Sequence, residues 1–273
     1  MIESSNDSLT RLDLGPDGVK ACCVNAYESD LMAMLLGNSY HPGGVELTRR
    51  LARRALRLGP DDVVADVASG QGTSALLMAE EFDAQVIGVD LSTLLVAEAT
   101  RRATTQGLGD RIDFRVGDAE QLPLDDGSVT AVICECAFCT FPDKATAARE
   151  FSRVLAPGGR VGITDMVLEP AMLSDGLRTL TGWVACLADA QPLEVYAEIL
   201  EDAGLVVDMT ERHDETVTTM IDQIDARLRV LRMTGAHDGL GLDMSLALDL
   251  LAEARAAVET GTVGYALLGA HKP

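Results

Sequence analysis

The residue types and spacing that suggest chemistry begin at residues 63–74, which read VVADVASGQGTS. An apolar run contains Asp66, and Gly70 and Gly72 follow where a turn into a helix is expected. The next apolar run, VIGVDL, contains a second acid, Asp90. Open α/β sheets hold an adenosine-containing cofactor with this arrangement: a buried strand, a glycine loop, a helix, and a second strand that ends in an acid.

The loop differs from the dinucleotide-binding motif. That motif, G-x-G-x-x-G, uses three glycines to bring the backbone against a pyrophosphate at a helix N-terminus. Here the third glycine is absent, and Asp66 lies where it would repel a pyrophosphate. A Rossmann oxidoreductase is therefore a distant alternative, and the carboxylate favours a cationic ligand. An isolated Gly-x-Gly would indicate only a turn, so the interpretation depends on the spaced acids as well.

With GDA at residues 117–119 after the third predicted strand, the pattern resembles the class I S-adenosylmethionine-dependent methyltransferases. The resemblance implies S-adenosylmethionine as cofactor, with the loop against its methionine part, Asp90 on the ribose hydroxyls and Asp118 beside the adenine. Tyr27 is either the tyrosine that covers the cofactor in this family or a core residue. The cofactor-binding residues expected from the resemblance are Asp66, Ala68, Ser69, Gly70, Gly72, Asp90, Leu91, Asp118, Ala119, Glu135 and Tyr27.

Cysteines cluster at the fourth predicted strand. Cys134 and Cys136 are two apart and share a face, and Cys136 and Cys139 straddle the end of the strand at which open sheets bind ligands. A cysteine on a central strand can equally be a small apolar core residue. We expect a core role for Cys134 and leave both roles open for Cys136 and Cys139.

The segments VICECA, which contains Cys136, and WVACLADA, which contains Cys186, resemble the arsenite methyltransferases. The resemblance covers roughly residues 20–210 and is more specific in the core than at the N-terminus. It implies that Cys136 and Cys186 hold the substrate, and that a third cysteine comes from a segment before the core. Cys22 or Cys23 could be this third cysteine.

The chemistry of trivalent arsenic agrees with such a set of residues. As(III) is soft and thiophilic, so thiolates suit it better than imidazole or carboxylate. Three thiolates leave its lone pair free to attack the sulfonium methyl in line, and no general base is needed. The protein then supplies alignment and thiol deprotonation, and a thiol reductant is the expected partner. Four ligands with the spacing of a zinc site are not evident, and we predict no metal site.

Two features depart from the arsenite family. Glu135 stands where an amide is usual; it would attract the cofactor but could also hold a proton or accept a hydrogen bond from an amine substrate. The chain also ends just after the predicted closing strand, whereas many arsenite enzymes have a separate C-terminal domain. Two alternatives stay open: a methyltransferase acting on a small natural product at O, N or C, and a thiol-based metalloid-binding or sensing protein without turnover.

Length and charge narrow the class of protein. The 273 residues suit one large domain, and 43 acids against 22 bases give a net charge of −21. Such a surface repels phosphate, so we expect a small-molecule or metalloid substrate and neither nucleic acid nor membrane as partner. No membrane-spanning run or signal-peptide pattern is present, which predicts a cytoplasmic location with cysteines as thiols. The oligomeric state stays open.

The elements that must position these residues alternate as strand and helix. This pattern predicts an α/β fold with a doubly wound, mostly parallel seven-stranded sheet of the Rossmann-like kind. Strands are expected near residues 63–67, 86–90, 112–116, 130–135, 160–165, 205–211 and 263–270, with helices near 73–82, 92–106, 144–155 and 192–203. The predicted organisation is a loose arm over 1–20, a helical cap over 21–60, and a methyltransferase domain over 61–273 with insertions at about 170–190 and 216–258.

Two further features are predicted to be structural. Five arginines between residues 49 and 57 lie on an amphipathic helix, where a solvated face is favoured over an anion site. His41 precedes Pro42 and is more simply a turn residue than a catalytic base.

Overall fold

The computed structural model describes residues 11–37, 40–169, 189–235 and 242–273, with side chains from Gly15 onward. Seven strands in these ranges form one sheet of order β3-β2-β1-β4-β5-β7-β6. Their bounds are β1 Val63–Val67, β2 Gln85–Asp90, β3 Ile112–Val116, β4 Val129–Glu135, β5 Leu155–Leu168, β6 Val206–Arg212 and β7 Val263–His271. The predicted fold class is confirmed.

The pairing of the strands defines where a ligand can bind. Strands β1 to β5 pair in parallel, and β7 lies antiparallel between β5 and β6. The order runs outward in opposite directions from β1 and β4, which are neighbours. Ligands in open sheets bind beyond the carboxyl ends of the strands at such a reversal.

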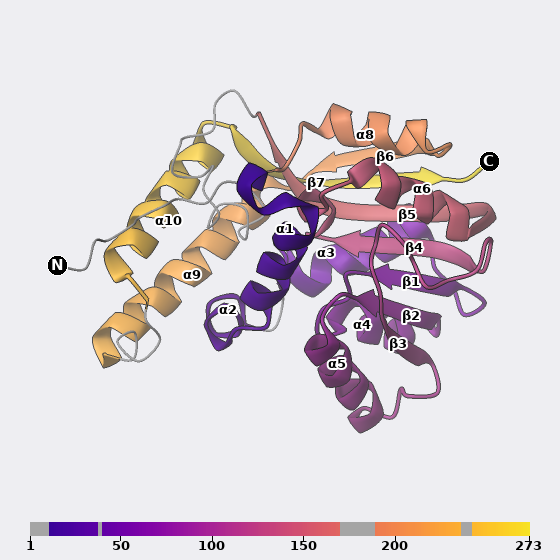
Figure 1. Cartoon of the computed structure of the whole chain (residues 1–273), viewed down its shortest axis with the longest axis horizontal. Coiled ribbons are helices and arrows are strands. Elements are labelled where there is room, and N and C mark those ends of the chain that lie inside the picture. Colours follow the sequence, from indigo (N-terminus) through magenta and orange to yellow (C-terminus); the bar gives the residue numbers. More distant parts are fainter. Residues whose placement is uncertain (1–10, 38–39, 170–188, 236–241) are drawn as a thin grey trace.

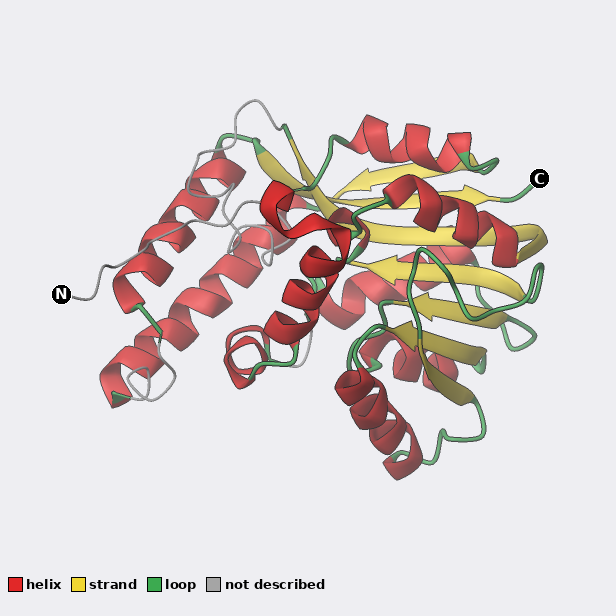
Figure 2. Cartoon of the chain, viewed as in Figure 1, coloured by secondary structure: helices red, strands yellow, loops and turns green. Residues whose placement is uncertain are grey.

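Helices cover both faces of the sheet (Figure 2). The segment α3 (Gly44–Leu51) and η1 (Ala52–Leu56) packs with α4 (Thr73–Phe82) on one face. Helices α6 (Lys144–Val154) and α8 (Leu193–Asp202) pack together on the other face, and α5 (Thr93–Thr105) packs on β2 and β3. Helices α4, α5 and α6 connect consecutive parallel strands as crossovers, whereas α3 and η1 precede β1.

Two helices at the N-terminal end, α1 (Arg11–Tyr27) and α2 (Asp30–Leu36), lie beside the strand ends toward which β1, β2 and β4 point (Figure 1). The prediction of a loose arm over residues 1–20 is wrong for residues 11–20, and residues 1–10 lie outside the described ranges. Gly15, next to Pro16, forms a kink inside α1, with φ +65° and ψ 174°. Helix resumes after it because Pro16 suits a first helical turn and Val19 is buried.

The predicted insertion at residues 216–258 contains two helices, α9 (Asp214–Thr234) and α10 (Met244–Glu259). They pack on each other and on β7, and α9 also contacts α2. Most of the other predicted insertion, residues 170–188, lies outside the described ranges.

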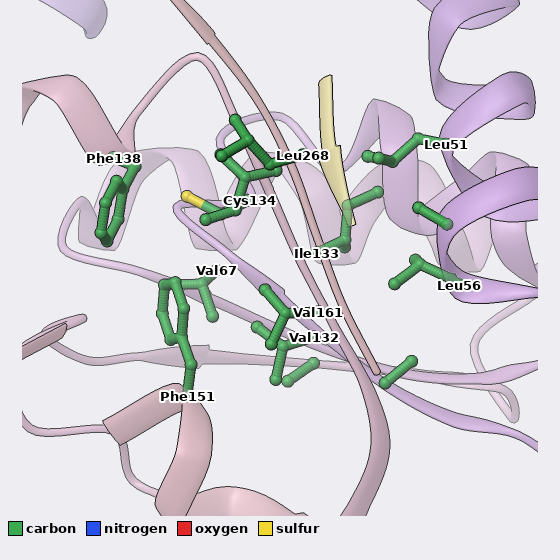
Figure 3. Close-up of a cluster of buried hydrophobic side chains, with 14 of the residues drawn as sticks. Leu51, Leu56, Val67, Val132, Ile133, Cys134, Phe138, Phe151, Val161 and Leu268 are labelled. Atoms are coloured by element: carbon green, nitrogen blue, oxygen red, sulfur yellow. The ribbon is translucent and has the colours of Figure 1, made fainter. Parts of the chain in front are cut away.

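The core is continuous through the sheet. Figure 3 shows Leu51 and Leu56 on one side of the central strands and Phe138 and Phe151 on the other. All four side chains are at most 5% exposed. Within the described residues, no helix combines the length and apolarity needed to cross a membrane.

Candidate active site

A cavity opens at the predicted place, beyond the ends of β1, β2 and β4. Its empty volume, including the open mouth, is about 1230 Å³. Expected site residues that line it are Cys23, Tyr27, Asp66, Ala68, Ser69, Gly70, Asp90, Leu91, Asp118, Ala119, Glu135 and Cys136.

The glycine loop turns sharply from β1 into α4. Ala68, Gly70 and Gly72 all have positive φ, at +59°, +52° and +76°. A Cβ at Gly72 would lie 2.6 Å from the Phe114 ring, so a larger residue at this position would collide with the ring. Gly72 was predicted to bind the cofactor, but it is not among the residues that line the cavity. The left-handed Ala68 is a strained position of the kind found at ligand sites.

Asp66 presents an unused acceptor to the cavity. It is 3% exposed, and its Oδ2 and the Ser69 hydroxyl are buried with no hydrogen-bond partner in the described part of the chain. Burial raises the pKa of Asp66 well above its ordinary value, and the nearby Glu135 and Asp90 carboxylates raise it further. A buried acceptor without a donor is costly, so the site suits a ligand that brings N–H groups. The ammonium of S-adenosylmethionine is such a group.

Asp90 ends β2 and is oriented by the loop. The Gly70 N–H donates to its Oδ2 and the Ser92 N–H to its Oδ1, each at 2.8 Å. Burial raises the pKa of Asp90, although these two hydrogen bonds oppose the shift. The carboxylate is thus held at the cavity wall, where it can accept hydrogen bonds from the ribose hydroxyls of the cofactor.

Asp118 is tied to the N-terminal helix. The Lys20 ammonium lies 2.7 Å from Asp118 Oδ2 and 2.6 Å from Glu120 Oε2. Burial lowers the pKa of the Lys20 ammonium. Its hydrogen bonds and charge interactions with the two acids together outweigh this effect, so the pKa is raised above its ordinary value. Lys20 itself lines the cavity, so α1 closes the end of the site where the adenine is expected.

Two tyrosines line the cavity beside the loop. The rings of Tyr27 and Tyr40 are 6.0 Å apart, and the Gln71 side-chain amide donates to the Tyr40 hydroxyl at 2.6 Å. The Ser92 hydroxyl donates to the carboxylate of Glu28 at the end of α1. These contacts hold the end of α1 and the segment around Tyr40, which together cover the cavity, on the glycine loop and on the turn after Asp90.

Glu135 is held by hydroxyl groups. Its side chain is 4% exposed and accepts hydrogen bonds from the hydroxyls of Thr48, Ser74 and Thr164. His41 Nε2 lies 3.8 Å from Glu135 Oε2, and its Nδ1 lies 3.2 Å from the Pro42 carbonyl oxygen. Both ring nitrogens of His41 thus face protein groups, which agrees with a structural role.

The cysteines within the described ranges lie in three kinds of environment. Cys136 has φ +52°, donates its N–H to the Thr164 carbonyl at 2.7 Å and lines the cavity, as does Cys23. Cys22 is not among the lining residues. Cys139 is buried, with its N–H on Asp165 Oδ2 at 3.0 Å.

The remaining cysteines are Cys134 and Cys186. Cys134 lies within the hydrophobic core (Figure 3), where burial raises the pKa of its thiol well above the ordinary value. Cys186 lies outside the described residues. Among the residues that are described, no group of three or more His, Cys, Asp and Glu has metal-binding geometry.

Comparison with known proteins agrees with this geometry. Residues 65–163 match a family model described as a methyltransferase domain. The chain is 32% identical over 171 residues to the arsenite methyltransferase of Halobacterium salinarum, a match that covers 62% of this chain and only 43% of that protein. It is 29% identical to the 27-O-demethylrifamycin SV methyltransferase of Amycolatopsis mediterranei, over 90% of this chain and 94% of that enzyme.

Two more matches extend over most of the chain. The methyltransferase GfsG of Streptomyces halstedii is 30% identical and is matched over 81% of its length. The solved structure of the (4+2)-cyclase SpnF matches 97% of this chain at 26% identity, with a TM-score of 0.72. The chain belongs to the class I S-adenosylmethionine-dependent methyltransferases. It is an enzyme whose cofactor is S-adenosylmethionine.

Sequence reasoning missed several residues of the site. Lys20 lies in the predicted loose arm, and no site role was predicted for Tyr40. Thr48 was missed although it is a polar residue on the buried side of a predicted amphipathic helix, which is a usable signal. The sequence contains no sign that these residues meet, because each comes from a different segment.

Proposed function

We propose that this enzyme transfers the methyl group to trivalent arsenic held by cysteine thiolates. The observation that carries the proposal is that Cys136, after β4, and Cys23, on α1, line the same cavity as the glycine loop. Soft thiolates suit As(III), and Cys136 follows the central strand at the switch point of the sheet. The arsenic lone pair is the nucleophile, so no side chain has to remove a proton.

Cys186, which the family resemblance pairs with Cys136 as a substrate ligand, is followed by Asp189, a residue held by an ion pair. The ammonium of Lys144, 8% exposed, pairs with the carboxylate of Asp189 and lies 3.1 Å from the Phe141 carbonyl oxygen. Phe141 lines the cavity. Asp189 is three residues after Cys186, which itself lies outside the described residues. The ion pair therefore fixes the chain at Asp189, and the role of Cys186 stays a prediction.

The test is methylation of As(III) by the purified chain with S-adenosylmethionine and a thiol reductant, followed by mass spectrometry. Methylated arsenic is expected from the wild type, and none from Cys136→Ser, Cys186→Ser or Cys23→Ser. The neighbouring Cys22→Ser is the matched variant and should keep activity. Activity that survives both Cys136→Ser and Cys186→Ser would exclude thiolate ligands from the mechanism.

A small organic acceptor is the second candidate. The rifamycin-type relative is matched along nearly its whole length, whereas the arsenite relative is matched over less than half of its own. The same assay with hydroxylated natural products, 27-O-demethylrifamycin SV among them, distinguishes the two. Transfer to an organic acceptor that persists in Cys136→Ser favours this candidate. Binding of As(III) without any methylated product favours a metalloid-sensing role.

A further inference from the structure

Two carboxylates of the cavity wall have opposite hydrogen-bonding states. Asp66 Oδ2 is buried and has no donor in the described part of the chain. Glu135 has donors on both of its oxygens, yet it lines the same cavity. A ligand with N–H groups improves the environment of Asp66, whereas it offers little to Glu135.

The donors of Glu135 come from three separate elements. The Thr48 hydroxyl of α3 lies 3.2 Å from Oε1 and 3.0 Å from Oε2, and the Ser74 hydroxyl of α4 donates to Oε2. The Thr164 hydroxyl of β5 lies 3.3 Å from Oε1, and it accepts from the Tyr265 hydroxyl at 3.1 Å. A carboxylate offers about four acceptor positions, and most of them are taken here. The Glu135 carboxylate is therefore fixed in place and has little remaining demand for hydrogen-bond donors.

S-adenosylmethionine carries two positive centres that differ in their hydrogen-bond donors, as the two carboxylates differ in their need for donors. Its ammonium brings three N–H donors, and its sulfonium brings none. We propose that Glu135 is the counter-charge of the sulfonium, while Asp66 receives the ammonium. The position of Glu135 agrees with this assignment, because it directly precedes Cys136 at the end of the sheet where the acceptor is expected.

This arrangement gives the site a preference for the charged cofactor. Methyl transfer converts the sulfonium into a neutral thioether, and the attraction to Glu135 then disappears. Charge interactions at a partly buried wall are stronger than in water. Glu135 therefore retains S-adenosylmethionine and favours release of S-adenosylhomocysteine. A neutral amide side chain at position 135 would lack this preference for the charged cofactor.

Calorimetric titration of the full chain with three ligands tests the proposal. S-adenosylmethionine carries a positive charge on its sulfur, and sinefungin carries an ammonium on the carbon that replaces this sulfur, whereas S-adenosylhomocysteine carries no charge there. All three share the α-ammonium, the carboxylate and the adenosine. We expect Glu135→Gln to weaken the two charged ligands by about tenfold or more, and S-adenosylhomocysteine by less than about threefold. Glu135→Asp keeps the charge and should keep most of the preference.

The matched control is Asp66→Asn, which should weaken all three ligands alike because they share the ammonium. Equal weakening of the three ligands by Glu135→Gln overturns the proposal, since it indicates an ammonium anchor or a purely structural role. Unchanged affinities overturn it as well. The wild type gives a test that needs no variant: equal affinity for S-adenosylmethionine and S-adenosylhomocysteine contradicts the proposal.

Discussion

The cavity has two walls that are built differently. The sheet wall presents Asp66 and Asp90 from the strand ends, and Asp90 is oriented by two short hydrogen bonds from backbone N–H groups of adjoining turns. The covering wall is α1 with the segment around Tyr40. It is held by contacts between distant segments, such as Lys20 with Asp118 and Gln71 with Tyr40.

The two walls should therefore contribute differently to cofactor affinity and to cofactor release. Groups fixed by their own strand and turn are preorganised and should supply most of the cofactor affinity. Isolated side-chain contacts between segments each contribute little, so the covering wall should open more readily than the sheet wall. We therefore expect the sheet wall to determine the equilibrium affinity and the covering wall to influence the rate of cofactor release.

The largest effect is expected from Asp90→Ala. Loss of hydrogen bonds to a charged group, each worth about 1.5–3 kcal/mol, should weaken S-adenosylmethionine by about 100-fold or more. Calorimetric titration measures this, and Asp113→Ala on the neighbouring strand, an exposed partner of Arg115, serves as the control. An affinity within threefold of the wild type would remove Asp90 from the site.

Asp66→Asn should weaken the cofactor by about tenfold and yet stabilise the ligand-free chain at pH 8, because it removes a buried charge. The folded-state pKa of Asp66 is raised, so its favourable contribution is complete below the unfolded pKa and is lost as pH rises through the folded pKa. Thermal unfolding should show a higher Tm for the variant at pH 8 and no such gain at pH 4. A lower Tm at pH 8 would contradict a buried, unsatisfied Asp66.

Lys20→Met tests the covering wall. Loss of its pair with Asp118 and Glu120, on the order of 1 kcal/mol, should speed release of S-adenosylhomocysteine by about three- to tenfold. Stopped-flow displacement measures the rate, and Lys20→Arg should preserve it. Added salt should accelerate release from the wild type more than from Lys20→Met. Identical rates and salt dependence would show that α1 does not retain the cofactor.

The smallest effect is expected from the arginine run. Arg49 pairs with Glu46 and Glu81, and Arg50 pairs with Glu211, all at the surface. This agrees with the predicted solvated face, so Arg49→Gln and Arg50→Gln should leave cofactor affinity within about twofold. A large loss in the same titration would identify an anion site that the ion pairs conceal.

The strands and the glycine loop were predictable from local pattern. β1 and β3 have the predicted bounds, and α4 matches residues 73–82. These elements alternate apolar strands with amphipathic helices, and this signal is contained in neighbouring residues. The loose arm was predicted wrongly over residues 11–20 because Gly and Pro, here Gly15 and Pro16, end a helix in most contexts. Here the buried Val19 and the paired Lys20 stabilise helix beyond it.

The sequence by itself determined the fold class and, through the family resemblance, the cofactor. It also predicted that Asp66, Asp90 and Asp118 meet at one edge of the sheet, because strand order and loop spacing bring them there, and all three line the cavity. Only the tertiary structure decided which N-terminal cysteine lines the cavity, and that Glu135 is enclosed by hydroxyls from three elements. The physical reason is distance along the chain. Contacts between segments depend on how helices pack on the sheet, and no local pattern of residues encodes that packing.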